Sequence, residues 1–575
     1  MQMRRTAWTG AGLALALTLA ACGGSSKPST SATTGTATGG ATGGSTSSAP
    51  APAGKSGGTL KVLVGTAADS LDPQFGYTTQ AAEPDVQVYL PLLNYAYKEG
   101  TAGTQLQPAL AQALPTVSAN QLTYTIKLRS GLKYSDGTAI KASDFTHAIE
   151  RACKISWGGK SFFTGSIKGA AAYDKGKAST ISGIKTDDAT GAITITLTQP
   201  NGAFDNILAF EAASPIPAST PMKVLSNTPP VGDGPYKFAK IVPNASYTLV
   251  KNPQFAGLKI PNIPVGFLDT VQVTVDSNNV TEAQQVINNQ ADVFDPGDEL
   301  PATVLPTISQ QATGRYTKEA LASTYYFFLN TRVKPFNNAA VRQAVSSAVD
   351  RTALARTSSG SLVPGCFFLP PTIVGHNTGN CASGDPNTVP SAAAVAKAKA
   401  AIAKAGLAGS KVTVWSETRT PRQQFCLYLT DLLNKLGFKA SIKVIQDSVY
   451  FQTIGNQKLN AQVGFADWSQ DFPNPTDFYL LLSKAGIQAV NNENFGNVDD
   501  PKIESQLAKL QAVPAAQLAG STSAWQALDK YVDQQAYTIS YGYLVSPKLM
   551  SNRVNFASAV FHPVNYLLYN TVSLK

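Results

Sequence analysis

The segment Asp467-Trp-Ser-Gln-Asp-Phe-Pro-Asn-Pro-Thr-Asp-Phe478 combines aromatic, acidic and proline residues directly after a short apolar run. That run, residues 461–466, alternates in polarity and predicts a β-strand. Pro473 and Pro475 end the strand and prevent a helix from following at once. The tryptophan and the carboxylates are therefore predicted on a rigid turn at a strand end, where α/β proteins place ligand-binding groups. The alternative from local chemistry is a surface turn with solvated aspartates.

A parallel sheet is predicted upstream of this turn. Residues 411–415 and 439–445 have strand patterns and flank an amphipathic helix over 423–436. This βαβ order is typical of a parallel sheet. The polar loop between the first strand and the helix carries Arg419 and Arg422. Loops at this end of parallel strands are usual ligand positions, and a guanidinium group suits a carboxylate ligand.

The N-terminus has the features of a secretory signal. Two arginines precede an apolar run over residues 11–21, which is too short to remain as a membrane span. We therefore predict a signal peptide over 1–21, with Cys22 as the first residue after it. Residues 22–58 are rich in Gly, Ser, Thr, Ala and Pro and are predicted to form a disordered, flexible tether.

The composition excludes several classes of protein. The formal net charge is +10, but the basic residues are dispersed and form no nucleic-acid-binding arm. The three histidines lie far apart in the sequence, so we expect no histidine-based metal site and no cofactor. Residues 59–575 are enough for roughly three domain-sized units and contain no apolar run long enough to cross a membrane.

Five cysteines are present. Cys366 and Cys381 flank a loop rich in Pro, Gly and Asn, so a local disulfide is predicted between them if the protein is exported. Cys153 and Cys426 then either pair with each other or stay buried and free.

Several motifs resemble, in order, those of extracellular solute-binding proteins of the peptide/nickel class, the receptors of ABC importers for dipeptides and oligopeptides. Residues 467–478 are similar to the family's W-x-x-D-[YF]-P-x-P segment. The other motifs are residues 57–73 (GGTLxVxxxxxxxSLDP), 124–145 (YTIKLRSGLKYSDGTAIKASDF), 230–238 (PxGTGPYxF, with Asp233 in place of the usual Thr) and 335–351 (PFxDxxVRxAxxxAIDR). In the third of these, two glycines are expected to supply positive φ. Leu19-Ala-Ala-Cys22 resembles a bacterial lipobox, which implies diacylglyceryl attachment at Cys22.

The resemblance implies an α/β, two-lobed, periplasmic-binding-protein-like fold of class II with an extra small α/β domain in the first lobe. The chain is expected to leave the first lobe near Tyr325 and to return near Ser540. The implied boundaries are 59–95, 200–323 and 540–575 for lobe I, 96–199 for the small domain and 324–539 for lobe II.

The resemblance also implies a ligand site. Asp471 would hold a peptide's α-ammonium, and Arg419, with Arg422 as the alternative, would bind its carboxylate. Backbone pairing with the ligand would come from Tyr77, Thr78, Thr79, Trp468 and Ser469, with a helix over 83–93 after the first three. Oligopeptide receptors often carry a cysteine where Ser469 stands, so that disulfide is absent here.

The function implied by the resemblance is a lipid-anchored receptor without enzyme activity. It would capture a small solute, foremost a di- or oligopeptide, and deliver it to an ABC permease, acting as a monomer at the outer face of the cell membrane. The same role for an oligosaccharide, an opine or a metal chelate is one alternative. An envelope hydrolase that uses Asp467 and Asp471 as a carboxylate pair is another, although no G-x-S-x-G or H-E-x-x-H motif occurs. A passive surface adhesin would need no enclosed cleft.

Overall fold

The computed structural model describes residues 54–295, 297 and 299–575. The predicted signal peptide, the proposed lipid site at Cys22 and the tether up to residue 53 lie outside the described residues. Among the helices that are described, none has both the length and the apolarity of a bilayer span.

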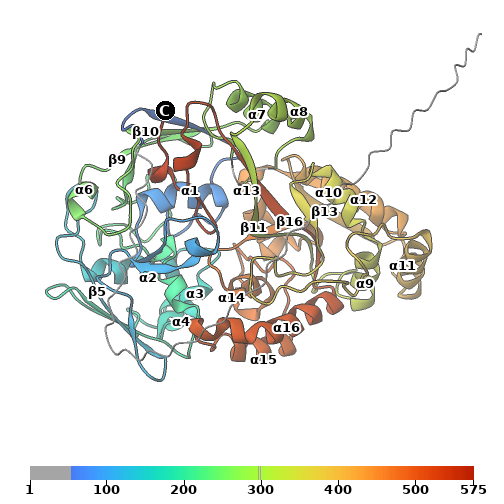
Figure 1. Cartoon of the computed structure of the whole chain (residues 1–575). Helices are drawn as coiled ribbons and strands as arrows, with labels where there is room; N and C mark the ends of the chain where they lie inside the picture. Colours follow the sequence, from blue (N-terminus) through green and yellow to red (C-terminus); the bar gives the residue numbers. More distant parts are fainter. Residues whose placement is uncertain (1–53, 296, 298) are drawn as a thin grey trace, which may run out of the picture. The chain divides into compact units, whose positions relative to one another are not determined.

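Helices are distributed along the whole described chain (Figure 1). The α-helices in the described part are α1 (Thr79–Val88), α2 (Ala142–Lys154), α3 (Ser161–Thr164), α4 (Ala170–Asp174), α5 (Phe204–Ile207), α6 (Phe255–Leu258), α7 (Asn279–Ile287), α8 (Leu305–Gln311), α9 (Ala339–Ala348), α10 (Arg351–Thr357), α11 (Ala392–Lys404), α12 (Arg422–Lys435), α13 (Asp447–Ile454), α14 (Pro475–Tyr479), α15 (Pro501–Leu510) and α16 (Thr522–Gln535).

The strands form separate sheets. The first sheet has the order β1 (Thr59–Val64), β10 (Thr270–Val275), β9 (Ser246–Lys251) and β8 (Tyr236–Val242). A small antiparallel sheet has the order β4 (Thr116–Val117), β5 (Thr123–Lys127), β7 (Ala192–Thr196) and β6 (Ile184–Asp187). The largest sheet has the order β12 (Leu362–Pro364), β16 (Thr538–Leu549), β11 (Tyr316–Leu329), β15 (Val463–Ser469), β13 (Lys411–Glu417) and β14 (Lys439–Ile445). Short antiparallel pairs join β2 (Leu93–Tyr95) to β3 (Leu106–Pro108) and β17 (Phe561–His562) to β18 (Tyr566–Leu567).

Two long strands connect the first sheet with the largest one. β11 and β16 pair antiparallel over almost their whole length, with a register irregularity between Ala320 and Thr324. Directly after β16, Met550 bridges to Val293, which in turn bridges to Val62 of β1. Figure 1 shows β11 and β16 between the part that contains β9 and β10 and the part that contains α9 to α12. The polypeptide therefore passes between these parts along two neighbouring strands, close to the crossings expected near Tyr325 and Ser540.

Several local predictions agree with the structure. β13 and β14 are parallel neighbours, and α12 connects them. In β5 the side chains of Tyr124 and Ile126 are buried and those of Thr125 and Lys127 are exposed, because successive strand residues point to opposite faces. The residues of β5 thus alternate between a buried and an exposed face, as in a half-buried strand.

Two element boundaries differ from the prediction. β15 continues through Asp467, Trp468 and Ser469, so these residues belong to the strand rather than to the turn. Their pairing with β11 outweighs the local turn signal, because each ladder partner adds hydrogen bonds. The helix expected over 83–93 is α1, which begins at Thr79 and ends at Val88.

The early end of α1 is explained by the loop that contains Gly232 and Gly234. The backbone N–H groups of Asp233 and Gly234 donate to the carbonyl of Val88, and the Asp233 carboxylate accepts the N–H of Leu90 at 2.8 Å. The expectation of positive φ at the two glycines is wrong. Glycine is needed there because a Cβ atom would overlap the carbonyl oxygen of the residue at the end of α1 or of the one before it. The loop thereby fixes the C-terminal end of α1.

Cys366 and Cys381 form a disulfide in the structure, with Cα atoms 6.2 Å apart. Cys153 and Cys426 are both buried and free, which decides between the two alternatives left open by the sequence. Burial raises the pKa of each of these thiols to about 12, so neither is a reactive thiolate near neutral pH.

We expect replacement of Cys366 and Cys381 by serine to lower the free energy of unfolding by about 3 kcal/mol, because the bridge closes a short loop in the unfolded chain. Trypsin leaves both cysteines in one peptide, 357–397. Without reductant this peptide should be lighter by two hydrogen atoms, and chymotryptic fragments cut after Phe367 should stay joined. A Cys153→Ser variant should retain the bridge. Two free thiols in protein taken from the cell envelope would contradict the prediction.

Candidate functional site

A pocket lies between residues of the first sheet's loops and residues of the largest sheet. Its volume is about 140 Å³, room for roughly ten water molecules at about 10–15 Å³ each. It is lined from the loop after β1, from α1, from the start of α13 and from the end of β15. The seven predicted ligand-binding residues all line it, namely Tyr77, Thr78, Thr79, Arg419, Trp468, Ser469 and Asp471.

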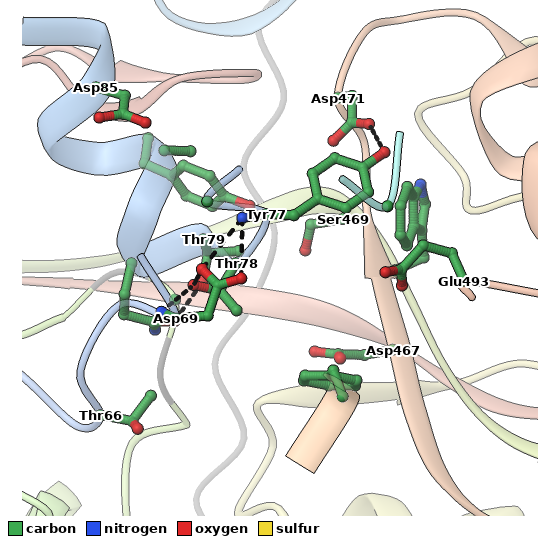
Figure 2. Close-up of a pocket in the computed structure, with 18 of the residues that line it drawn as sticks. Thr66, Asp69, Tyr77, Thr78, Thr79, Asp85, Asp467, Ser469, Asp471 and Glu493 are labelled. Atoms are coloured by element: carbon green, nitrogen blue, oxygen red, sulfur yellow. Dashed lines mark hydrogen bonds between the residues drawn. The ribbon is translucent and has the colours of Figure 1, made fainter. Parts of the chain in front are cut away.

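Asp471 lies at one wall of this pocket and is hydrogen-bonded to Tyr77, which also lines the pocket. The Tyr77 hydroxyl donates to Asp471 Oδ2 at 2.6 Å, as Figure 2 shows. Behind it, Asp477 accepts the backbone N–H of Asp471 at 2.9 Å and the indole N–H of Trp468 at 3.3 Å. Burial raises the pKa of Asp471, and burial together with the charge of Asp471 raises that of Asp477. A cation in the pocket would favour the ionised form of these carboxyl groups.

An aromatic cluster forms the floor beside Asp471. The ring of Tyr77 contacts Trp157, Trp468 and Phe210 edge to face, with centroid distances of 5.3, 5.5 and 6.3 Å. Edge-to-face contacts of this kind stabilise ring positions beyond the effect of buried area alone. Tyr77 and Trp468 are therefore held in place by packing.

The segment Tyr77–Thr79 differs from expectation in its backbone. Asp69 accepts the backbone N–H of Tyr77 at 3.1 Å and the hydroxyl of Thr78 at 3.1 Å (Figure 2). The Tyr77 N–H is therefore already bonded within the protein, and the pairing of a ligand backbone with Tyr77–Thr79 stays a prediction. Thr79 is the first residue of α1. Tyr77 instead presents its phenol ring and hydroxyl to the pocket.

Trp468 and Ser469 lie at the end of β15 and pair with a strand on one side. On one side they pair with Thr324 and Ser323 of β11. On the other side, β13 pairs with β15 only as far as Gly464. Within the described residues, the end of β15 thus has no strand partner on that side, and Trp468 and Ser469 line the pocket.

Arg422 is engaged by protein carboxylates. It donates to Glu417 at 3.0 Å, lies 3.1 Å from Asp467 and 3.4 Å from Glu299, and donates to the hydroxyl of Tyr325 at 2.9 Å. Its side chain is only 5% exposed. Arg419 also lines the pocket and donates to the carbonyl of Gly297 at 3.4 Å, so the choice between the two arginines stays open. Asp467, the second carboxylate of the hydrolase alternative, is occupied by Arg422.

Several acidic residues of the pocket were not predicted from the sequence: Asp69, Asp85, Glu211, Glu417, Asp447 and Glu493. They lie on segments distant in the sequence, so no local pattern groups them. The signal that was available is weak: acidic and amide residues on the buried face of a helix, as Glu83 and Asp85 are in α1. Burial raises the pKa of Glu211 and of Glu493 to about 8, and the charge of Asp471 adds to both shifts.

The histidines are separate from the pocket. His147, His376 and His562 each contact a backbone carbonyl oxygen. The described residues contain no group of three or more His, Cys, Asp and Glu side chains arranged to hold a metal ion.

A family model described as "Bacterial extracellular solute-binding proteins, family 5 Middle" matches residues 105–489. The chain is 25% identical over 529 residues to the probable deoxycholate-binding periplasmic protein YgiS of Escherichia coli K12, covering 88% of this chain and 91% of that protein. It is 25% identical over 395 residues to the oligopeptide-binding protein OppA of Bacillus subtilis, covering 66% and 68%.

Among solved structures, Haemophilus influenzae OppA in complex with RPPGFSPFR aligns with a TM-score of 0.76 and 18% identity, covering 90% of this chain and 99% of that one. This likeness concerns the fold. It confirms the predicted two-lobed α/β architecture.

Proposed function

Because the chain belongs to the bacterial extracellular solute-binding proteins of family 5, we propose that it is the receptor of an ABC importer and that it captures a peptide by its ammonium group. The observation that carries the proposal is the position of Asp471. It is a half-buried carboxylate in the family's W-x-x-D position, at the wall of the pocket and beside Trp468.

The charge of the pocket supports a ligand with an ammonium group. Among the described residues, eight carboxyl groups and two arginines line the pocket. Burial raises the pKa of several of these carboxyls, and a ligand cation would favour their ionised form. An anion such as deoxycholate, named for the YgiS relative, would give these carboxyl groups no counter-charge. The ligand class named for the OppA relative, an oligopeptide, carries the required ammonium.

The proposed binding mode uses both ends of the peptide. Asp471 takes the α-ammonium and Arg419 the carboxylate, so that each buried charge gains a partner. The free backbone edge at Trp468 and Ser469 pairs with the peptide backbone, as in strand addition. The two lobes close when these contacts form, since contacts made only in the closed state shift the equilibrium towards it. The closed receptor then delivers the ligand to a membrane permease.

We propose no catalysis. In the hydrolase alternative, Asp467 would act with Asp471 as a carboxylate pair. Asp467 instead lies 3.1 Å from Arg422, an arrangement suited to holding the end of β15 rather than to proton transfer. Any ligand that binds should therefore be recovered unchanged.

The experiment that tests the proposal identifies the ligand. Protein purified from the cell envelope is analysed by native mass spectrometry, and the molecule released on unfolding is sequenced by fragmentation. We expect a peptide with a free ammonium group. A sugar, an opine or a metal chelate would transfer the receptor role to that ligand class, and a hydrolysed product that accumulates with time would favour the enzyme.

We also propose that the receptor is anchored by lipid at Cys22, which follows the lipobox-like residues 19–21. A labelled fatty acid should enter the wild-type chain and a Cys153→Ser control, and should be lost in Cys22→Ala. Equal labelling of the wild type and Cys22→Ala would exclude this anchor.

A further inference from the structure

Two buried carboxyl groups of the pocket, those of Asp85 and Glu211, accept no hydrogen bond from another described residue. Asp85 projects from α1, on the opposite side of Tyr77 from Glu493 in Figure 2. Asp85 is only 2% exposed, and its Oδ1 atom is buried without a hydrogen bond. Glu211, which is 8% exposed, also lines the pocket. In the described part of the structure, neither carboxylate accepts a hydrogen bond from another residue or forms an ion pair.

The charge of Glu211 acts on Asp85. Burial raises the pKa of Asp85, and the charge of Glu211 contributes next. Burial also raises the pKa of Glu211, and the charge of Asp471 adds to it. A buried carboxylate without a partner costs free energy, and such groups in native proteins require an explanation. Two of them facing one cavity, close to the proposed ammonium site, point to a second positive charge on the ligand.

The remaining carboxylates of the pocket already have partners. Glu417 and Asp467 are bound by Arg422, Asp69 by backbone N–H groups and Asp447 by Thr418. Glu493 has no hydrogen bond, but it belongs to a residue of intermediate exposure, so water can reach it. This difference distinguishes it from Asp85 and Glu211 and makes it a suitable control.

We propose that Asp85 and Glu211 form a second cation subsite, which binds the ammonium or guanidinium group of a basic side chain while Asp471 holds the α-ammonium. The proposal rests on the proposed function, in which the ligand is a peptide, and it specifies the substrate class as peptides with Lys or Arg at or next to the N-terminus. A second cation between these carboxylates would form charge-assisted bonds with both. It would also remove the repulsion between them.

The test compares peptides that differ only in this charge. Calorimetry would measure the affinities of Lys-Ala-Ala and Ala-Lys-Ala, and of the same peptides with norleucine in place of lysine. We expect the better lysine peptide to bind at least about 10-fold more tightly than its norleucine partner. Asp85→Asn and Glu211→Gln should each bring this ratio close to one, whereas Glu493→Gln should leave it unchanged. Equal affinities in the wild type would overturn the proposal, and so would loss of the ratio in Glu493→Gln alone.

The wild-type ratio needs no variant, so a variant that fails to fold does not remove the test. If peptides bind without preference for lysine, the second subsite fails and the peptide receptor stands. If no peptide binds but 1,5-diaminopentane does, and Asp85→Asn weakens it, the peptide function fails and the second subsite stands.

Discussion

Asp471→Ala is expected to weaken ligand binding by roughly 30-fold or more. The half-buried Asp471 carboxylate lies at the pocket wall and accepts the Tyr77 hydroxyl at 2.6 Å, with Asp477 behind it. In the proposed complex it is the counter-ion of the ligand's ammonium. Loss of one partner of a buried charge pair costs about 2–5 kcal/mol, and each 1.4 kcal/mol changes the affinity about tenfold. Calorimetry with the ligand identified by mass spectrometry would measure the loss.

Two further variants separate charge from shape. Asp471→Asn retains the size of the side chain and an acceptor for Tyr77, so its affinity should fall nearly as far as that of the alanine variant. Asp447→Asn also removes a charge from the pocket, but from a carboxylate already bonded to the N–H of Thr418 at 2.9 Å, and should change the affinity only slightly. The assigned role of Asp471 is wrong if its alanine variant binds as tightly as the wild type.

The largest effect on stability is expected for Arg151→Met. Arg151 on α2 forms a two-pronged contact with Asp72, at 2.6 and 2.5 Å, and both side chains are 0% exposed. It also donates to Gln74 at 2.8 Å and to the carbonyl of Pro221 at 2.9 Å. Removal of the arginine leaves the Asp72 carboxylate buried without its cation, which typically costs about 3–5 kcal/mol. Urea and thermal denaturation would measure this loss.

A surface pair provides the control for this variant. Lys435 and Asp431 also form an ion pair, but their side chains are 66% and 63% exposed. Lys435→Met should therefore cost less than about 1 kcal/mol. An equal, small effect of both variants would mean that the buried pair does not stabilise the fold. Because Asp72 belongs to the loop that carries Tyr77 into the pocket, Arg151→Met should also weaken ligand binding.

Much of the fold was predictable because its signals are local. The alternation in β5 and the order of β13, α12 and β14 follow from residue patterns within short windows. The end of β15 was not predictable in this way, since Asp467–Ser469 are held in the strand by β11, more than a hundred residues earlier in the chain. The reason for Gly232 and Gly234 is likewise a contact with the end of α1, which no local pattern reveals.

In the candidate site, too, residues on local motifs were predictable, and residues whose role depends on distant segments were not. The residues placed in the pocket from motif positions, such as Asp471 and Trp468, do line it. The sequence could not choose between Arg419 and Arg422, because the carboxylates that engage Arg422 come from separate segments. Asp85 and Glu211 were missed for the same reason: their relevance depends on a shared cavity and on the absence of partners among the described residues.

The contact of Tyr77 with Trp157 and Trp468 also places two fluorescent indole rings next to a tyrosine of the pocket. The chain contains five tryptophans, and these two have ring centroids within 5.5 Å of the same tyrosine. The emission of an indole depends on the polarity of its surroundings and on nearby charges. Excitation energy absorbed by a tyrosine at this distance is transferred to the indole. Ligand capture beside Trp468 should therefore alter the intrinsic fluorescence of the unlabelled protein, and Trp468→Phe should remove most of that signal while the buried Trp525 continues to emit.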